Sequence, residues 1–201
     1  MALEHFYNIK EKKKNNILDA IEKCMQQYNY DELSVNDIVK EADISRGSFY
    51  NYFVDKNDAV ETLIKEKIKT VFEKFKECII KNDGKLFDGV YDGYMQIKDM
   101  LRNKIFFTIM KNLKFFIEIG HKILYSKGYE EELQGFLDWL LENTVEGREI
   151  FKTREDMANI VDLLIALISN ITLKMVIISD KNDNNYGFEY KFNVIKKGVM
   201  S

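Results

Sequence analysis

The chain has 201 residues and a formal net charge of −3 at pH 7, with no proline, ten glycines and two cysteines. This charge argues against a strongly basic protein that holds nucleic acid without regard to sequence, although it leaves room for a small basic patch. Two isolated cysteines also exclude a disulfide framework and a four-cysteine zinc site. Because helix-breaking residues are absent or scarce, we expect an all-α fold.

The N-terminal segment predicts no secretion signal, because charged residues stand where the apolar core of such a signal would be. The most apolar run, residues 160–178, contains Asp162, Asn170 and Lys174, which a membrane span tolerates poorly. We therefore expect a cytoplasmic protein without a membrane partner.

A first amphipathic helix is predicted to end near Tyr28. Its apolar residues recur at steps of three and four, as on one face of a helix, and are Ile17, Ala20, Ile21, Cys24, Met25 and Tyr28. Asn29 then stands at the position of a left-handed C-terminal cap, a conformation that asparagine tolerates.

Side-chain caps predict that short helices follow in close succession. Ser34, with an acidic residue three positions later, resembles a capping box and opens the second helix. Ser45 is placed to cap a third helix that reaches about Phe53, and Asp55 is placed to cap a fourth. Three short helices followed by a long one are typical of a helix-turn-helix module.

The remainder of the chain is also predicted to be helical, with no flexible linker before it. The expected helices cover residues 57–81, 86–101, 104–126, 130–151, 154–180 and 188–200, which makes about nine in the whole chain. The helix at 154–180, capped by Thr153, is apolar on almost every side and must bury more than one face. We expect one face to meet its own core and the other to meet a second copy of the chain. The predicted homodimer interface consists of the helices at about 154–180 and 187–200.

Residues 17–63 read ILDAIEKCMQQYNYDELSVNDIVKEADISRGSFYNYFVDKNDAVETL and resemble the N-terminal domain of the TetR family of transcriptional regulators. The residues that carry the resemblance are Ile17, Leu18, Ala20, Tyr30, Val35, Ile38, Ala42, Ser45, Gly47, Ser48, Tyr50, Tyr52, Phe53 and Lys56. The sequence departs from the family pattern at Met25, Asn29 and Asp43, where the family has Phe, Gly and Gly. Asp43 stands in the turn of the module, and aspartate also tolerates the left-handed conformation required there.

The resemblance implies two domains. Residues 1–56 are expected to form a helix-turn-helix DNA-binding domain whose recognition motif covers about 33–53. Residues 57–201 are expected to form a helical domain for ligand binding and dimerisation. The implied function is that of a repressor which binds a palindromic operator as a homodimer and responds to a small molecule.

Helical spacing places the side chains of the third helix on two sides. Phe49 and Phe53 are expected to anchor the helix against the first two helices. The opposite side is expected to face the major groove and carries Gly47, Ser48, Asn51 and Tyr52.

Three residues of this segment are suited to close approach to the duplex or to contact with its bases. Gly47 has no Cβ, so the N-terminus of the helix can approach the duplex closely. Arg46 and Asn51 are expected to reach base edges, arginine toward guanine and asparagine toward adenine.

The resemblance assigns other residues to the phosphate backbone. It implies that Tyr50 and Tyr52 donate their hydroxyl groups to phosphates, and that Ser34 and Lys56 clamp the backbone. The full set of predicted DNA-binding residues is Ser34, Ser45, Arg46, Gly47, Ser48, Tyr50, Asn51, Tyr52 and Lys56.

Charge limits the non-specific affinity of this domain for DNA. Residues 1–67 contain ten Lys or Arg and thirteen Asp or Glu, a balance of −3. Binding must therefore depend on a few well-placed contacts and on dimer symmetry. Lys10 and the lysines at 12–14 either give the first helix a basic start near DNA or form an ordinary solvated face, and the sequence leaves both interpretations open.

Aromatic and sulfur-containing side chains in the larger domain are candidates for an effector pocket. They are Tyr91, Tyr94, Phe106, Phe107, Met110, Phe115, His121 and Trp139. Such residues at helical spacing also form plain hydrophobic cores. If they line a pocket, it suits an apolar or aromatic ligand.

The sequence contains no signature of catalysis. Neither histidine has a metal-binding partner at the usual spacing, and no phosphate-binding loop or nucleophile motif is present. We expect no enzymatic activity, no cofactor and no metal. Two alternatives to the regulator remain open: an architectural or division-control protein that binds DNA without a small ligand, and a helix-turn-helix that serves protein contacts only.

Overall fold

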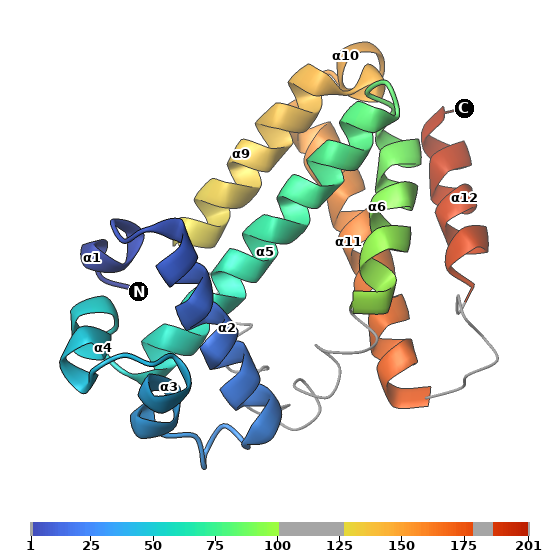
Figure 1. The fold of residues 1–201 in the computed structure, drawn as a ribbon. Coiled ribbons are helices and arrows are strands. Elements are labelled where there is room, and N and C mark those ends of the chain that lie inside the picture. Colours follow the sequence, from blue (N-terminus) through green and yellow to red (C-terminus); the bar gives the residue numbers. More distant parts are fainter. Residues whose placement is uncertain (1, 101–126, 179–186, 201) are drawn as a thin grey trace. The chain divides into compact units, whose positions relative to one another are not determined.

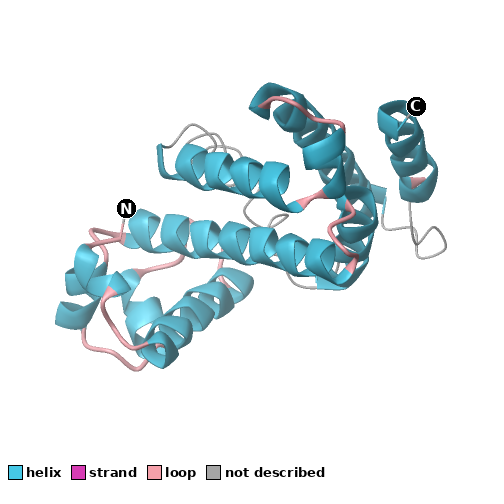
Figure 2. Ribbon diagram, turned by 90° about the horizontal axis from the view of Figure 1, so that it is seen from above, coloured by secondary structure: helices cyan, strands magenta, loops and turns pink. Residues whose placement is uncertain are grey.

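The computed structural model describes residues 2–100, 127–178 and 187–200. In these ranges the chain forms ten helices and no strand (Figure 1; Figure 2). They are α1 Glu4–Tyr7, α2 Glu11–Gln27, α3 Val35–Glu41, α4 Arg46–Tyr52, α5 Lys56–Lys81, α6 Leu86–Met100, α9 Lys127–Asn143, α10 Val145–Glu149, α11 Arg154–Ile178 and α12 Phe188–Met200. The all-α fold is confirmed, while the helix predicted at 104–126 lies outside the described residues.

The chain divides into two compact units. Among the described residues, the first contains residues 2–70 and 127–129, and the second contains residues 71–100, 130–178 and 187–200. Helix α5 therefore contributes residues to both units. The domain boundary expected after residue 56 stays a prediction.

The predicted caps of the short helices are confirmed. Ser34 Oγ accepts a hydrogen bond from the Asp37 N–H at 3.3 Å, and the Asp37 carboxylate accepts one from the Ser34 N–H at 2.9 Å, which completes the capping box of α3. The Asp55 carboxylate accepts from the Asp58 N–H at 2.8 Å, at the start of α5. Local sequence thus determines where these helices begin.

The left-handed cap predicted at Asn29 is wrong. The described residues other than glycine that have positive φ are Asp43 and Asp83. Helix α2 ends instead at an extended Tyr28, and the Asn29 carbonyl accepts from the N–H groups of Glu32 and Leu33 at 3.1 and 3.0 Å. The chain leaves α2 through this turn, so no left-handed residue is needed.

Helix α1, which the sequence did not predict, completes the core of the first unit. Its Phe6 is fully buried, with a ring centroid 4.9 Å from that of Phe53. The Leu3 N–H donates to the Tyr52 carbonyl oxygen at 2.8 Å. This short segment is therefore fixed against the C-terminal end of α4.

The second unit has its own core, to which α5, α6, α9, α11 and α12 contribute. Phe72 of α5 stacks on Phe136 of α9, with ring centroids 4.7 Å apart. Gly89 of α6 lies so close to α5 that an added Cβ would stand 2.4 Å from Ile79 Cα. Glycine at this position permits the close packing of the two helices.

The single helix predicted at 130–151 is wrong, because the chain breaks at Thr144. The buried Thr144 hydroxyl donates to the Leu140 carbonyl oxygen at 2.7 Å, ending α9, and accepts from the Gly147 N–H at 2.9 Å, which caps α10. The Glu146 carboxylate then accepts from the Leu86 N–H at 2.8 Å, at the N-terminus of α6. The break thus brings the Glu146 carboxylate to the N-terminus of α6, where a negative charge interacts favourably with the helix dipole.

Helix α11 begins as predicted. Asp156 accepts from the Thr153 N–H at 3.1 Å, and Thr153 Oγ accepts from the Asp156 N–H at the same distance. Within the described ranges, no helix is both long enough and apolar enough to cross a membrane.

Candidate nucleic-acid interface

Helix α4 is fixed by its cap and by two phenylalanines. Ser45 Oγ accepts from the Ser48 N–H at 3.0 Å and lies 2.9 Å from the Ser48 hydroxyl. Phe49 and Phe53 are fully buried, with ring centroids 5.3 Å apart, as predicted. The helix is therefore held from its inner side, and its outer side does not contribute to the core.

Exposed residues of α4 include Arg46, Gly47, Tyr50 and Asn51, and the side chain of Tyr50 is 44% exposed. A Cβ added at Gly47 would meet only Ser45 Oγ, at the ordinary contact distance of 3.8 Å. The folded chain itself therefore does not require glycine at this position. We define the α3–α4 face as Asn36, Arg46, Gly47, Tyr50 and Asn51.

The prediction that Tyr52 points away from the core is wrong. Only 8% of this residue is exposed, and its ring lies 6.2 Å from that of Phe6. Helix α1 covers this side of α4, which helical spacing alone could not reveal. A phosphate contact by the Tyr52 hydroxyl stays a prediction.

Arg46 contacts a residue that the sequence analysis did not identify. Its Nη1 donates to Asn36 Oδ1 at 3.1 Å, which joins the first residue of α4 to an exposed residue of α3. The guanidinium carbon also lies 5.9 Å from the centre of the Tyr50 ring. The available signal was a polar residue in the first turn of α3, between Ser34 and Asp37 of the capping box.

Two residues predicted to clamp the DNA backbone have partners within the protein. The Ser34 hydroxyl donates to Asp37 Oδ2 at 2.5 Å, and hydrogen bonds from Ser34 lower the pKa of Asp37. Lys56 Nζ donates to the carbonyl oxygens of Tyr30 and Leu33, both at 2.8 Å. These two side chains fasten the module internally, and their contacts with DNA stay predictions.

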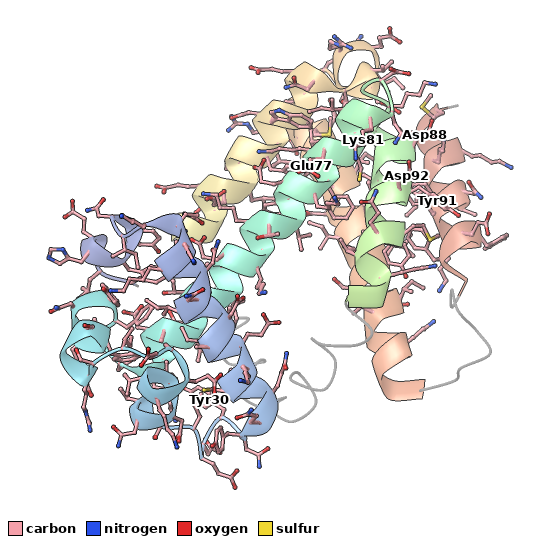
Figure 3. The ribbon with its side chains drawn as sticks, viewed as in Figure 1. Tyr30, Glu77, Lys81, Asp88, Tyr91 and Asp92 are labelled. Carbon is pink, nitrogen blue, oxygen red and sulfur yellow. The ribbon has the colours of Figure 1, made fainter. Side chains whose placement is uncertain are left out.

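Tyr30 lies in the loop between α2 and α3 (Figure 3). Its ring is 4.3 Å from Lys56 Nζ, and burial raises the pKa of its hydroxyl to about 12. The loop before the helix-turn-helix is thus packed against the start of α5.

The turn between α3 and α4 keeps the geometry expected of it. Asp43 has a φ of 50°, in the left-handed region, and is exposed. The Ile44 N–H donates to the Val39 carbonyl oxygen at 3.0 Å across this turn.

One lysine of the basic run at the start of α2 lies close to α4. Lys13 Nζ is 5.5 Å from the centre of the Tyr52 ring.

Three of the predicted pocket residues lie in the described part of the second unit. Tyr94 is fully buried and stacks on Phe188 at 3.9 Å between centroids, while Tyr91 and Trp139 are half-buried. The remaining candidates, Phe106, Phe107, Met110, Phe115 and His121, lie outside the described residues.

The described residues of the second unit line an apolar cavity of about 50 Å³ that is partly open to solvent. Its lining, which includes none of the predicted residues, consists of Phe72, Phe75, Leu86, Val90, Phe136, Leu140, Val161, Leu164, Ile165 and Ile168. Periodicity alone could not separate these side chains from the rest of the core.

A polar groove of about 460 Å³ lies between α6 and α12. Asp88, Tyr91 and Asp92 of α6 contribute to it (Figure 3), and Lys196 Nζ donates a hydrogen bond to Asp88 Oδ1 at 2.5 Å.

Across the described ranges, no group of His, Cys, Asp or Glu side chains has the geometry to hold a metal ion.

Comparison with known proteins agrees with the geometry of the first unit. Residues 17–63 match the sequence model of the bacterial regulatory proteins of the tetR family. No curated protein sequence matches the chain at a significant level.

Solved structures share the fold over nearly the whole chain. The transcriptional regulator FadR from Bacillus subtilis, crystallised with stearoyl-CoA, has a TM-score of 0.57 and 20% sequence identity, over 92% of this chain and 98% of its own. The dihydroxyacetone kinase operon activator DhaS has a TM-score of 0.53 and 17% identity, over 94% of this chain and 96% of its own. These TM-scores establish the shared fold. The segment at residues 17–63 is thus similar to the tetR family of bacterial regulatory proteins.

Proposed function

We propose that the chain is a cytoplasmic transcriptional repressor that binds a palindromic operator as a homodimer and responds to a small apolar or aromatic ligand. The observation that carries the proposal is the α3–α4 face, on which arginine, asparagine and tyrosine side chains are exposed around an unobstructed glycine. These are the residue types that contact bases and phosphates in the major groove.

DNA binding is tested by mobility-shift titration with the DNA that flanks the protein's own gene. Operator-like DNA is expected to be retained at much lower protein concentration than scrambled DNA. The dependence of affinity on salt should be shallow, because the acidic N-terminal region permits few phosphate contacts. Equal and weak retention of both DNAs would contradict the proposal and favour a helix-turn-helix that serves protein contacts.

Exposed apolar side chains on the last two helices support the homodimer. Leu163 and Ile165 are exposed on α11, and on α12 Tyr190 and Val194 are 76% and 55% exposed. The two α12 residues are one helical turn apart and lie on the same side. A second copy of the chain would bury these groups, and each buried aliphatic side chain contributes about 1.5–3 kcal/mol.

Sedimentation velocity of Val194→Glu tests this interface. The variant is expected to sediment as a monomer and to lose operator binding. Ile80→Glu is the matched control, because Ile80 is an exposed residue of α5, and it should remain dimeric. A dimeric Val194→Glu variant would contradict the proposed interface.

The apolar cavity supports an apolar ligand, but its volume limits how the ligand enters. At about 50 Å³ it is smaller than the 300–1,000 Å³ of typical ligand pockets, so binding requires the lining helices to move apart. Such a movement is the two-state change that a ligand-controlled regulator needs. Because the regulator FadR was crystallised with stearoyl-CoA, a long-chain acyl-CoA is the first ligand to test.

A thermal-shift assay with stearoyl-CoA, paired with an operator titration, tests the ligand. The compound is expected to raise the melting temperature and to change operator affinity. Val90→Phe fills the cavity and should abolish both responses while leaving operator binding intact.

The small cavity also favours one alternative, an architectural or division-control protein of the same fold without a small ligand. Unchanged melting temperature and operator affinity across a panel of acyl-CoA and aromatic compounds would support this alternative. A reporter assay tests separately whether the protein represses or activates transcription, since DhaS, which shares the fold, is an operon activator. Deletion of the gene should raise reporter expression if the protein is a repressor and lower it if it is an activator.

A further inference from the structure

We propose that Asn36 is a positioning residue that holds Arg46 in place and thereby determines the base preference of the protein. This inference rests on the proposed DNA-binding function. It concerns a residue of α3 that acts through α4, and it follows from the hydrogen bond of 3.1 Å between Arg46 Nη1 and Asn36 Oδ1.

Asn36 and Arg46 both lie in the first turn of a capped helix. Asn36 is in the first turn of α3, within the Ser34–Asp37 capping box. Arg46 is the first residue of α4, directly behind the Ser45 cap. Each helix start is held by its own side-chain hydrogen bonds, so the distance between the two residues is set by rigid elements.

The guanidinium group is supported on a second side by Tyr50. Its carbon lies 5.9 Å from the centre of the Tyr50 ring, within the range of a cation–π interaction. A free arginine side chain loses considerable rotamer entropy when it binds, and this loss is smaller if the side chain is already ordered. The two supports therefore prepare Arg46 for binding before DNA arrives.

The chemistry of the pair assigns different roles to its members. Arginine carries five N–H donors, so a hydrogen bond to Asn36 leaves the remaining donors for the O6 and N7 atoms of guanine. Because a guanidinium group has no acceptor, the atom of Asn36 that faces it must be the carboxamide oxygen. A bidentate contact with adenine needs both the oxygen and the nitrogen of a carboxamide. The Asn36 oxygen keeps one further lone pair while it holds Arg46, so the test must separate positioning of Arg46 from direct base contact by Asn36.

The test begins with selection of preferred DNA from a random duplex pool by the full-length wild-type protein. Affinities of wild type, Asn36→Ala, Arg46→Ala and the double variant are then measured for the selected operator and for operators changed at one base pair. Both single variants are expected to lose at least about threefold of the preference for guanine, at the same base pair. The double variant should lose no more than Arg46→Ala alone, because the two residues act as a unit.

Conservative and neighbouring variants separate positioning from general effects. Asn36→Asp keeps an acceptor for Arg46, so it should retain the base preference while its negative charge weakens binding to all DNA alike. Lys40→Ala removes a charge from an exposed α3 residue one turn further on, and it should leave the preference unchanged. Asn36→Ala should melt at the wild-type temperature, since the side chain is exposed.

Two results would overturn the inference while the proposed function stands. One is an unchanged preference in Asn36→Ala. The other is a change at a base pair different from the one affected by Arg46→Ala, with additive effects in the double variant, because Asn36 would then read a base by itself. If the wild-type protein selects no sequence at all, the proposed function fails first.

Discussion

Lys56, the first residue of α5, holds Tyr30 in two ways: its ammonium group donates to the Tyr30 carbonyl oxygen at 2.8 Å and lies 4.3 Å from the centre of the Tyr30 ring. The same ammonium group also donates to the Leu33 carbonyl oxygen at 2.8 Å. One lysine therefore joins the long helix to the loop that precedes the helix-turn-helix. This internal role must be separated from any contact that Lys56 makes with DNA.

Lys56→Met is expected to lower the free energy of unfolding of the first unit by about 2–3 kcal/mol, since hydrogen bonds from a charged donor are lost and two carbonyl oxygens lose their partner. Urea denaturation followed by circular dichroism measures the change. Lys12→Met, at an exposed position of α2, is the matched control and should unfold at the wild-type urea concentration. If Lys56→Met is as stable as wild type but binds DNA weakly, the residue acts on DNA alone.

Gly47→Ala tests whether glycine at this position is required for stability or for DNA binding. The added methyl group has room in the free protein, and alanine favours helix more than glycine does, so stability should rise by up to about 1 kcal/mol. Operator affinity should nevertheless fall roughly tenfold, about 1.4 kcal/mol, because the methyl group stands between α4 and the duplex. The outcome is read from thermal melts and anisotropy titrations of the same samples. Wild-type operator affinity in Gly47→Ala would mean that α4 does not approach DNA at this residue.

Asp43 combines an unusual backbone conformation with a negative charge, and two variants separate these effects. Asp43→Gly relieves the left-handed conformation at φ 50° and should raise stability by roughly 0.5–1 kcal/mol. Asp43→Asn keeps that conformation and removes only the charge, so its stability should stay near that of wild type. Both variants should bind DNA more tightly if the carboxylate lies near the phosphates. Unchanged affinity in both would place the acid away from DNA.

Tyr94 should make the protein less stable at high pH. Burial raises the pKa of its hydroxyl to about 12, from an ordinary value of 10, so the folded state keeps the proton after the unfolded state has released it. Between these two pH values the unfolded state binds fewer protons, and the free energy of unfolding therefore falls as pH rises. Tyr94→Phe lacks this contribution and should become more stable relative to wild type as the pH rises from 10 to 12. Urea denaturation at several pH values measures the difference, and a constant difference would show that Tyr94 titrates normally.

Local signals in the sequence predicted the short helices well. Ser34, Ser45 and Asp55 each supply a side-chain acceptor to nearby backbone N–H groups, and such interactions depend on residues only three positions away. The alternation of buried phenylalanines with exposed residues in α4 is likewise a local property.

Features that depend on distant contacts were missed. Tyr52 is buried because Phe6, more than forty residues earlier, covers it, and a four-residue helix such as α1 has too little local signal to be recognised. The contact of the Glu146 carboxylate with the start of α6, sixty residues earlier, likewise has no local signal. Asn36 was not among the predicted DNA-binding residues because its proposed role depends on its contact with Arg46, ten residues later.

The most direct test of the central claim is a titration of operator and scrambled DNA with wild type, Tyr50→Phe and Asn51→Ala. Wild type should prefer the operator strongly. Tyr50→Phe should weaken binding to both DNAs by the same factor, about fivefold for one lost hydrogen bond of about 1 kcal/mol. Asn51→Ala should change the ratio of the two affinities, because it removes a contact with a base. Equal affinity of the wild-type protein for operator and scrambled DNA, unaltered by either substitution, would contradict the account.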